Sequence, residues 1–527
     1  MTKARKPLAL LFVLCFVLSA LVGCQQPAPS AAPSGAADSA APGSSAAAEP
    51  TKAATGEVKP CLYVTPGNTF PNQDTVLAAV NKQMQADGVN VAVSFKRIPW
   101  DGFLSKLNLM LSTGEEFDMM HVMQDIENLS VLRGMNAIVP IDKYLPNYPD
   151  LVSKFTDLMW AQGKVNGETY AVPANWQEFS MIYGNLTYRE DVFKKVQPDG
   201  VFPKDFDGFY DLCVKMQAEI KAETGKTAYM WIHQVTDSLG WLHRTYDDFP
   251  FFVDRSNELT KVAQDGTVAS YFESDTFKKD AAAYRKMFQG GLIDPDVLSV
   301  TPQKKYDDEK IGAFLPSATF SYDDEIPLQK NIATSTIAQS VLAPEKPWLQ
   351  YCSIQNLNAM SATSRDPESG LKFLQWLYNK KENHDLFCYG IEGTDYTASA
   401  ANRIKSTLGA DNNALYAFDT WMIGYLPYMR FDEATTQKGI DYKTKAATAD
   451  QVVLSPVVGF QFDATTVKNE LTNIQQVVTT SFYPIKYGLV DYDAAYSEAL
   501  KNLKAAGIDK YIAEYQKQLT AFLASKK

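Results

Sequence analysis

Cysteine and histidine are scarce in this sequence, and their scarcity excludes several kinds of site. Six cysteines and four histidines occur among 527 residues. There is no Cys-x-x-Cys pair and no His-Glu-x-x-His motif, so the sequence predicts neither a zinc site nor a disulfide scaffold. For the four cysteines after residue 60 the alternatives are one disulfide or four buried free thiols, and we favour the thiols. These cysteines are Cys61, Cys213, Cys352 and Cys388.

Motifs for phosphate binding, calcium binding and serine hydrolysis are also missing. Residues 224–227 (TGKT) resemble the end of a P-loop, but Ile220 stands where that loop needs its first glycine. The acidic runs at 307–309 and 323–325 lack the spaced oxygen ligands of an EF-hand and are typical of solvated loops. No Gly-x-Ser-x-Gly motif occurs. We therefore expect no metal, no cofactor and no enzymatic activity.

Basic residues are outnumbered, with 50 lysines and arginines against 61 aspartates and glutamates. The formal net charge is −11, and it becomes −14 when residues 1–23, which hold three basic and no acidic side chains, are removed. Because an acidic surface repels phosphate backbones, this balance argues against nucleic acid as a partner. The remaining chain is long enough for two or three domain-sized cores.

Long hydrophobic runs are confined to the N-terminus. Three basic residues precede an uncharged stretch from Pro7 to Val22, which is typical of a secretory signal peptide and slightly short for a membrane-spanning helix. The sequence LVGC at 21–24 resembles the lipobox of bacterial lipoproteins. That resemblance implies that residues 1–23 are a signal peptide, cut before Cys24, and that the Cys24 sulfur carries the lipid. The alternative is an uncleaved anchor helix in which the cysteine is incidental.

Residues 24–60 are mainly alanine, serine, proline and glycine. They offer too little bulky apolar surface to offset the entropy of ordering, so the sequence predicts a flexible tether. Each buried CH₂ of a lipid contributes about 0.8 kcal/mol, and two or more acyl chains therefore hold a protein firmly on a membrane. We expect a lipid-anchored protein on the extracellular face of the cell membrane.

The first part of the remaining chain alternates strand and helix patterns. Strands are predicted at 61–65, 89–95 and 117–123, with amphipathic helices at 72–87 and 100–113. This alternation is typical of an α/β fold with a doubly wound parallel sheet. Ligands of such sheets bind beyond the carboxyl ends of the strands, which here lie after Thr65 and Met123.

Further elements are predicted along the chain. They are a strand at 179–183, helices opening at 188 and spanning 209–222, a strand at 311–315, an extended stretch at 357–361, a helix at 367–378 and C-terminal helices at 494–505 and from 508 onward. Gly507 separates the last two helices, and the final helix carries apolar residues on one stripe.

Several short motifs, in this order, resemble one family. LSTGEEFDMM (111–120), IVPIDKYL (138–145), GETYAVP (167–173) and YREDVFKK (188–195) are similar to the extracellular solute-binding proteins of ABC importers, in the carbohydrate-binding group built like maltose-binding protein. YGIEGTDY (389–396), SPVVGFQFD (455–463) and KAAGIDKYIAEYQKQL (504–519) resemble the LplA-like lipoprotein branch of Gram-positive bacteria, which has a C-terminal helical region.

The resemblance implies a two-lobed, type II periplasmic-binding-protein-like fold with a hinge. The first lobe is expected to comprise 61–174 and about 310–352, and the second 175–309 and about 353–527 with the C-terminal helices. The two lobes would close on an oligosaccharide or related glycan, and the loaded monomer would deliver it to the transmembrane subunits of an ABC permease. The tether would keep that docking nearly intramolecular.

The resemblance also implies a set of ligand-binding residues. A sugar needs flat aromatic faces and paired polar groups, which tryptophan, tyrosine, carboxylates and amides supply. The residues expected in this role are Gln124, Asp125, Trp176, Gln177, Trp231, Phe320, Glu392, Tyr396 and Phe460. Phe320 and Phe460 stand near positions where the family places stacking tryptophans. Both are phenylalanine here, which is a departure from the family's pattern for sugar binding.

Each of these residues has a structural alternative. Asp125 could cap a following helix, and Trp231, Phe320 and Phe460 could belong to the core or the cleft wall. Trp100, Trp160 and Trp376 sit at helical spacing with other apolar residues and are assigned to the core.

Two other functions stay open at this point. The same scaffold could bind a peptide, a lipid-linked precursor or another non-sugar solute. A surface-anchored, glycan-cleaving enzyme is the third alternative, because the separation of two carboxylates is spatial and a sequence does not show it.

Overall fold

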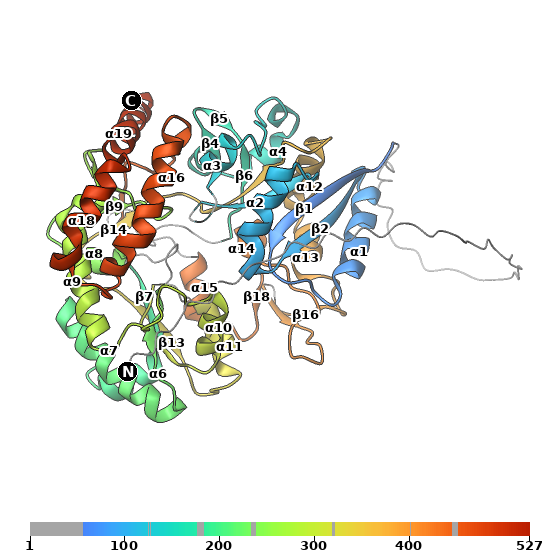
Figure 1. The fold of residues 1–527 in the computed structure, drawn as a ribbon. Helices are drawn as coiled ribbons and strands as arrows, with labels where there is room; N and C mark the ends of the chain where they lie inside the picture. Colours follow the sequence, from blue (N-terminus) through green and yellow to red (C-terminus); the bar gives the residue numbers. More distant parts are fainter. Residues whose placement is uncertain are drawn as a thin grey trace, which may run out of the picture. The chain divides into compact units, whose positions relative to one another are not determined.

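A computed structural model describes residues 56–124, 126, 128–176, 184–232, 239–318, 322–400, 402–444 and 452–526. Several features predicted above lie outside these residues: the signal peptide, Cys24, most of the tether, Asp125, Gln177, the strand at 179–183 and Phe320. The chain from Thr51 to Lys527 forms one compact unit, and its elements are labelled in Figure 1.

The first lobe is built on a five-stranded sheet with the order β2–β1–β3–β15–β6. The predicted alternation is confirmed: β1 (Lys59–Pro66), α1 (Gln73–Ala86), β2 (Val91–Ile98), α2 (Phe103–Thr113) and β3 (Met119–Met123) follow one another. β1 runs parallel to both β2 and β3, with Lys59 opposite Val91 and Tyr63 opposite Met119. Helix α2 ends where Gly114 adopts a left-handed conformation.

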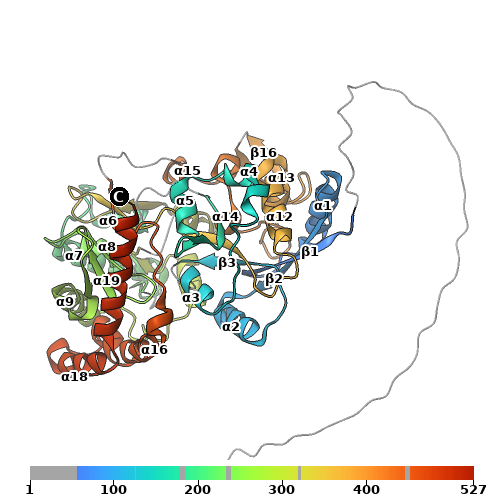
Figure 2. The same ribbon diagram turned by 90° about the horizontal axis from the view of Figure 1, so that it is seen from above.

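Two later strands complete this sheet. β15 (Asn356–Met360) pairs antiparallel with β3 and with β6 (Ala171–Pro173). All five residues of β15 are buried. The helices α12 (Glu368–Asn379) and α13 (Lys381–Tyr389) pack with α1 against one face of the sheet, and α2 belongs to the core on the other face (Figure 2).

The second lobe holds short strand pairs. β8 (Tyr229–Met230) pairs with β12 (Phe314–Leu315), β7 (Leu186–Arg189) with β13 (Ile337–Ser340), and β14 (Trp348–Gln350) with β19 (Val452–Leu454). β9 (Phe251–Val253), β10 (Thr260–Ala263) and β11 (Val268–Ser270) form an antiparallel sheet. α7 (Phe206–Thr224) and α9 (Asp275–Gln289) contribute to the same core.

These pairings correct the expected lobe boundaries. The segment 314–350 pairs within the second lobe, and 356–423 contributes strand β15 and helices to the first lobe, the reverse of the assignment made from the sequence. The reason is that β15 finds its partner, β3, more than 230 residues earlier in the chain. No local pattern of side chains encodes such a pairing.

The C-terminal helical region is confirmed. It consists of α16 (Lys468–Val477), α17 (Tyr483–Lys486), α18 (Tyr492–Ala505) and α19 (Ile508–Ser525). Gly507 separates the last two helices with φ = 100°, a conformation that glycine adopts without strain. The predicted stripe of α19 buries Ile508, Tyr511, Tyr515 and Leu519 in the core of the second lobe.

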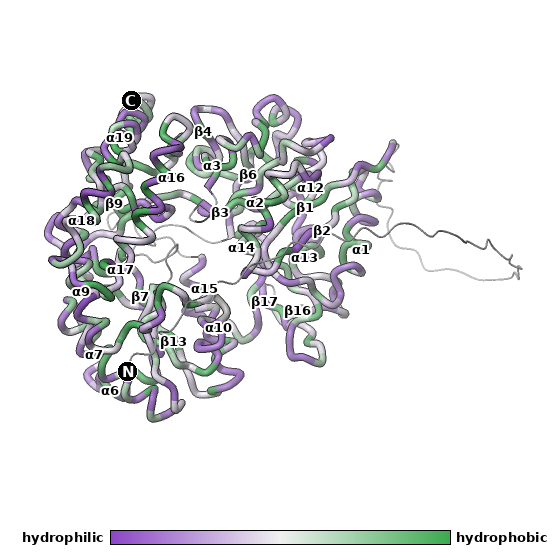
Figure 3. The backbone as a smooth tube through the Cα atoms, viewed as in Figure 1, coloured by the Kyte–Doolittle hydropathy of each residue, from purple (hydrophilic) through white to green (hydrophobic). Residues whose placement is uncertain are grey.

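Apolar residues concentrate inside both lobes, whereas the outer faces of the helices are mostly hydrophilic (Figure 3). The four cysteines of the described chain are buried and free, which confirms the expectation of thiols. Burial raises the pKa of the Cys61 and Cys213 thiols well above its usual range, so both stay protonated. No helix within the described residues is long and apolar enough to cross a membrane.

Candidate functional site

The carboxyl ends of the first-lobe strands meet at one edge of the sheet. The parallel strands β1, β2 and β3 end at Pro66, Ile98 and Met123, and β6 ends at Pro173 in the same direction because β15 is antiparallel to both neighbours. The first crossover to the second lobe leaves from this edge. In α/β sheets this is the edge at which ligands bind.

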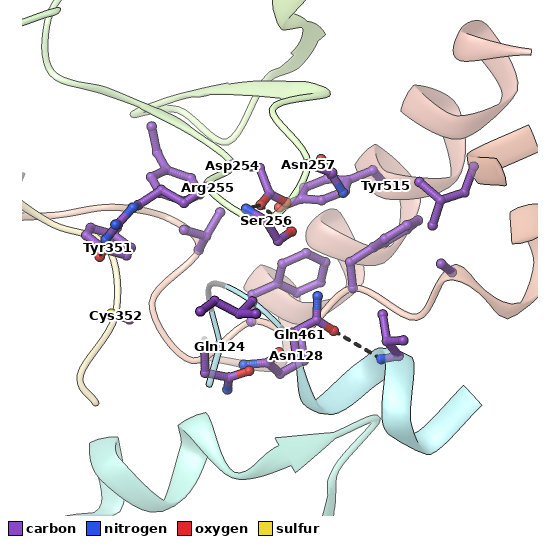
Figure 4. A pocket seen from close by; sticks show the side chains of 18 of the residues that line it. Gln124, Asn128, Asp254, Arg255, Ser256, Asn257, Tyr351, Cys352, Gln461 and Tyr515 are labelled. Atoms are coloured by element: carbon purple, nitrogen blue, oxygen red, sulfur yellow. Dashed lines mark hydrogen bonds between the residues drawn. The ribbon is translucent and has the colours of Figure 1, made fainter. Parts of the chain in front are cut away.

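A cavity of about 270 Å³ lies between the lobes at the end of β3. The first lobe contributes residues that follow β3 and precede β4 (Lys164–Val165). The second lobe contributes the loop after β9, the stretch 457–462 and the helices α16 and α19, and the crossover after β14 completes the wall (Figure 4). The polar lining side chains include Gln124, Asn128, Gln162, Asp254, Arg255, Ser256, Asn257, Gln355 and Gln461.

Aromatic rings form much of the cavity wall. Phe252 and Tyr351 stack with ring centroids 5.2 Å apart and an interplanar angle of 14°. Phe460 packs edge-on against Tyr515 at 5.3 Å. The Arg255 guanidinium lies 5.6 Å from the centre of the Tyr351 ring and donates a hydrogen bond of 2.5 Å to its hydroxyl. These contacts hold the rings in fixed orientations.

The polar groups of the cavity are anchored by local hydrogen bonds. Oδ1 of Asp254 accepts from the backbone N–H (2.8 Å) and the hydroxyl (2.7 Å) of Ser256, and burial raises the pKa of this carboxyl. Asn257 donates to the Tyr511 hydroxyl at 3.1 Å. Gln461 donates from Nε2 to the carbonyl of Gln162 at 3.3 Å, which joins the two lobes.

Gln124, predicted from the sequence, does line the cavity, but its amide has a structural task. Its Nε2 donates to the Gln162 carbonyl at 3.0 Å, and its Oε1 accepts from the N–H of Leu129 at 3.3 Å. Leu129 begins α3 (Leu129–Gly134), so Gln124 fixes the start of that helix. Phe460, also predicted, lines the cavity as described above.

The structure places Trp176 and Trp231 in apolar surroundings away from the cavity lining. Trp176 packs beside Met429, Phe431 and Ile440, and the ammonium group of Lys443 lies 5.2 Å from its ring. Trp231 is 9% exposed and belongs to a small core with Phe314, Leu328 and Ile337. The core alternative given for Trp231 agrees with this packing.

Glu392 and Tyr396 also lie apart from the cavity. Glu392 is exposed, whereas Tyr396 is 3% exposed at the start of β16 (Tyr396–Ala400), with its ring 6.2 Å from that of Tyr389. β16 belongs to a small sheet with β17 (Arg403–Ser406) and β18 (Phe431–Asp432). The structure therefore does not bring this pair together with Gln124 and Phe460.

The core assignment of Trp100 is wrong, although Trp160 and Trp376 are buried as predicted. Trp100 opens a 3-10 turn, η1 (Trp100–Gly102), ahead of α2 and is 38% exposed. Its ring lies 5.9 Å from that of Trp421, nearly parallel to it at 26°. The spacing of Trp100 from the apolar residues of α2 predicted a core position. Because Trp100 lies in the turn η1 before the helix begins, its ring stays at the edge of the sheet.

Trp421 was missed by the sequence analysis. It lies in α14 (Thr420–Ile423), and its ring is 5.0 Å from that of His121 in β3. We call Trp100 and Trp421 the tryptophan shelf. A Pro-Trp pair at the end of a predicted strand was the available signal for Trp100, whereas the placement of Trp421 depends on a contact between α14 and β15.

An ion pair lies next to the tryptophan shelf. Nη2 of Arg97 is 2.6 Å from Oδ2 of Asp419, and the side chains are 2% and 40% exposed. The guanidinium of Arg97 lies between the rings of Phe70 and Phe418, at 4.6 and 5.2 Å from their centres. A buried arginine thus holds an exposed carboxylate in place.

The chain was compared with known families and structures. Residues 69–384 match the family described as bacterial extracellular solute-binding protein, and residues 456–524 match a domain of unknown function, DUF3502. A carbohydrate ABC transporter substrate-binding protein of Streptococcus pneumoniae is 25% identical over 491 residues, which cover 90% of this chain and 94% of that relative.

Solved structures share the fold. The N-glycan transport solute-binding protein NgtS of S. pneumoniae superposes with a TM-score of 0.68 at 20% identity, covering 89% of this chain and 100% of that chain. An HMO-binding, ABC-transporter-associated solute-binding protein of Bifidobacterium longum infantis has a TM-score of 0.62 at 15% identity, covering 88% of this chain and 99% of that chain.

Proposed function

This chain belongs to the bacterial extracellular solute-binding proteins, and we propose that it binds an oligosaccharide between its lobes and delivers it to an ABC permease. The observation that carries the proposal is the composition of the interlobe cavity, where aromatic rings stand beside amide and carboxylate groups. Rings stack on the C–H faces of a sugar, and planar amides and carboxylates bind its hydroxyls in pairs.

Relatives support a glycan as the ligand. NgtS was solved with Man1GlcNAc and with Man5GlcNAc, and the S. pneumoniae relative described above is named a carbohydrate ABC transporter protein. The motifs in the second half of the chain support the same group, since the DUF3502 match at 456–524 covers the C-terminal helical region.

Lobe closure is the mechanism that this cavity favours. Its walls come from both lobes and from the crossover after β14, so a ligand that fills the cavity contacts both lobes at once. Such contacts are made in full only in the closed form. A ligand stabilises the closed form by the difference between its affinities for the two states.

The N-terminal sequence indicates where in the cell envelope the protein acts. We infer that Cys24 carries lipid and that residues 24–60 act as a tether on the outer face of the membrane. The tether raises the local concentration of the loaded protein at its permease, because docking becomes nearly intramolecular. The protein acts as a monomer in this scheme.

The enzyme alternative predicts a different result from the receptor. Glycoside hydrolysis uses two carboxyl groups and releases shortened glycans. A binding protein stabilised by a ligand gains RT ln(1 + [L]/Kd) in unfolding free energy without turnover. Stoichiometric binding without product release is therefore the expected result.

The test is a calorimetric and thermal-shift panel on residues 25–527. The panel contains Man1GlcNAc, Man5GlcNAc, kestose, maltooligosaccharides and a set of peptides. We expect at least one oligosaccharide to raise the Tm and to be recovered intact. Peptide binding without glycan binding would overturn the carbohydrate assignment, and glycan cleavage would favour the enzyme.

A matched pair of variants locates the site. Phe460 and Phe522 pack against each other with ring centroids 5.4 Å apart, but Phe460 lines the cavity and Phe522 does not. Phe460→Ala should weaken glycan binding about tenfold, whereas Phe522→Ala should leave it unchanged. Equal effects of the two substitutions would show that the packing of α19, and not the cavity, matters.

A further inference from the structure

The tryptophan shelf is exposed although tryptophan is costly to leave in water. Trp100 is 38% exposed, and Trp421 is half-buried at the edge of the first-lobe sheet. The two rings are nearly parallel, with centroids 5.9 Å apart. Aromatic side chains that present their faces at the ligand-binding edge of a sheet are suited to stacking on a flat partner.

A fixed carboxylate accompanies the shelf. Asp419 stands two residues before Trp421, and its Oδ2 is held by Arg97 at 2.6 Å. The side chain of Asp419 is 40% exposed, so its carboxylate also faces solvent. Arg97 in turn requires the glycine at 67: a Cβ there would lie 2.2 Å from Nη2 of Arg97. The arrangement therefore keeps a hydrogen-bond acceptor at a set position beside two aromatic rings.

The second lobe approaches the same place. The turn η1 that carries Trp100 contacts α10 (Pro302–Lys310) of the second lobe. Tyr306 of α10 is 40% exposed, and partial burial and then the negative charges of Asp324, Glu309 and Asp419 raise its pKa. The contact between α10 and η1 therefore brings the second lobe to the tryptophan shelf.

The tryptophan shelf and the interlobe cavity lie at two separate places along the same edge of the first-lobe sheet. Trp100 follows β2 and Gln124, which lines the cavity, follows β3, and β1 lies between these two strands in the sheet. Neighbouring strands lie about 4.8 Å apart, so the two places are roughly 10 Å apart along the edge. This separation exceeds the length of one sugar ring.

We propose that Trp100, Trp421 and Asp419 form a second sugar-binding subsite, which takes a residue of a glycan whose other end occupies the cavity. The inference rests on the proposed function and adds the class of ligand: a glycan of three or more residues. The C–H face of one sugar ring stacks on the tryptophan shelf, and the Asp419 carboxylate accepts hydrogen bonds from neighbouring hydroxyls of that sugar. Short ligands fill the cavity alone.

The experiment compares short and long members of each glycan series in the panel above, with Man1GlcNAc and Man5GlcNAc as one pair, on three proteins. Trp100→Ala removes the exposed half of the shelf. Leu109→Ala, on α2 and 60% exposed, is the control for loss of an exposed apolar side chain. Affinity is measured by calorimetry, and tryptophan fluorescence reports on the shelf directly.

We expect Trp100→Ala to lower the affinity for the long glycans about tenfold and to change the affinity for the short ones less than twofold. Its Tm should fall modestly, because the Trp100 ring packs against Phe103 and Trp421, and unchanged binding of the short glycans shows that the variant is folded. Leu109→Ala should bind both lengths as wild type does. Long glycans should also change the tryptophan fluorescence of wild type more than short ones do.

Two outcomes separate this inference from the proposed function. If wild type binds glycans but Trp100→Ala binds long and short ones with unchanged affinity, the second subsite is refuted and the cavity stands. If no glycan of any length binds wild type, the proposed function itself falls. Trp421→Phe, which keeps a ring in the half-buried position, should retain most of the long-glycan affinity if stacking is the interaction.

Discussion

Oδ2 of Asp463 lies 2.6 Å from Nη1 of Arg133, and this ion pair joins the C-terminal region to the first lobe. Asp463 precedes α16 in the second lobe, whereas Arg133 belongs to α3 in the first. The same oxygen of Asp463 accepts a hydrogen bond from Asn166 at 3.1 Å. The C-terminal helical region is thus attached directly to the opposite lobe.

Removing the ion pair between Arg133 and Asp463 should lower the free energy of unfolding, by an amount that depends on pH. Burial raises the pKa of Asp463, but hydrogen bonds from Thr465 and the charge of Arg133 outweigh burial and hold the pKa below its usual range. A lowered folded-state pKa contributes stability above the unfolded value, near 3.9, and this stability is lost as pH falls through the folded pKa. Arg133→Gln should cost about 1 kcal/mol at pH 7.

Chemical denaturation at pH 7 and at pH 3 checks this prediction. The difference between wild type and Arg133→Gln should shrink at the lower pH, where Asp463 begins to take up a proton. Lys501→Ala, a change in an exposed ion pair of α18, is the control and should stay within about 0.5 kcal/mol of wild type at both values. A constant difference at both pH values would contradict the assigned role of the charge.

Helix α19 should be essential for the stability of the second lobe. Leu519 is fully buried in the core that α19 shares with the sheet of β9, β10 and β11. Leu519→Ala should lower the free energy of unfolding by about 2–5 kcal/mol, because it removes buried methyl groups and leaves a cavity. The measurement is the urea midpoint, with Thr520→Ala on the exposed face as the control.

The buried imidazole of His121 should make the protein less stable in mild acid. Burial lowers the pKa of His121 to about 4, against about 6.5 in an unfolded chain. Below pH 6.5 the unfolded state binds the proton first, so stability falls by about 1.4 kcal/mol per pH unit until pH nears the folded value. His121→Asn should flatten the decline of the Tm between pH 6.5 and 4.5.

Other groups also titrate in that range, so the comparison must be made between variants. His384 is buried as well, and burial lowers its pKa to about 3. The slope for His121→Asn should therefore be reduced and not abolished. An unchanged slope would show that the pKa of His121 is the same in the folded and unfolded states.

Cys24 should determine where the protein is found. Cys24→Ala should release a protein of full glycan affinity into the medium, since the lipid is the expected link to the membrane. Fractionation of cells that make either form measures the effect. A Cys24→Ala protein that stays in the membrane fraction would support the uncleaved-anchor alternative.

Local patterns predicted the elements well where chain neighbours decide the structure. The strands and helices from β1 to β3 appear within a few residues of their expected limits, and Gly507 separates the last two helices as expected. The stripe of α19 packs as its periodicity indicates. Each of these features depends on side-chain spacing along a single element.

The candidate site was only partly predictable. Gln124 and Phe460 line the interlobe cavity, but Asp254, Asn257 and Tyr351 were not identified, because they follow short elements with no motif of their own. Trp100 was taken for a core residue since its spacing fits a helix, and the structure starts that helix three residues later.

By itself, the sequence predicted the α/β class and the amphipathic faces of the long helices, because these depend on short-range periodicity, and its motifs indicated the family by resemblance. Tertiary structure decided the lobe to which 314–350 and 356–423 belong, the closure of the cavity by residues from both lobes, and the pairing of Trp100 with Trp421. Those features arise from contacts between residues more than eighty positions apart, and their geometry is set by packing in three dimensions.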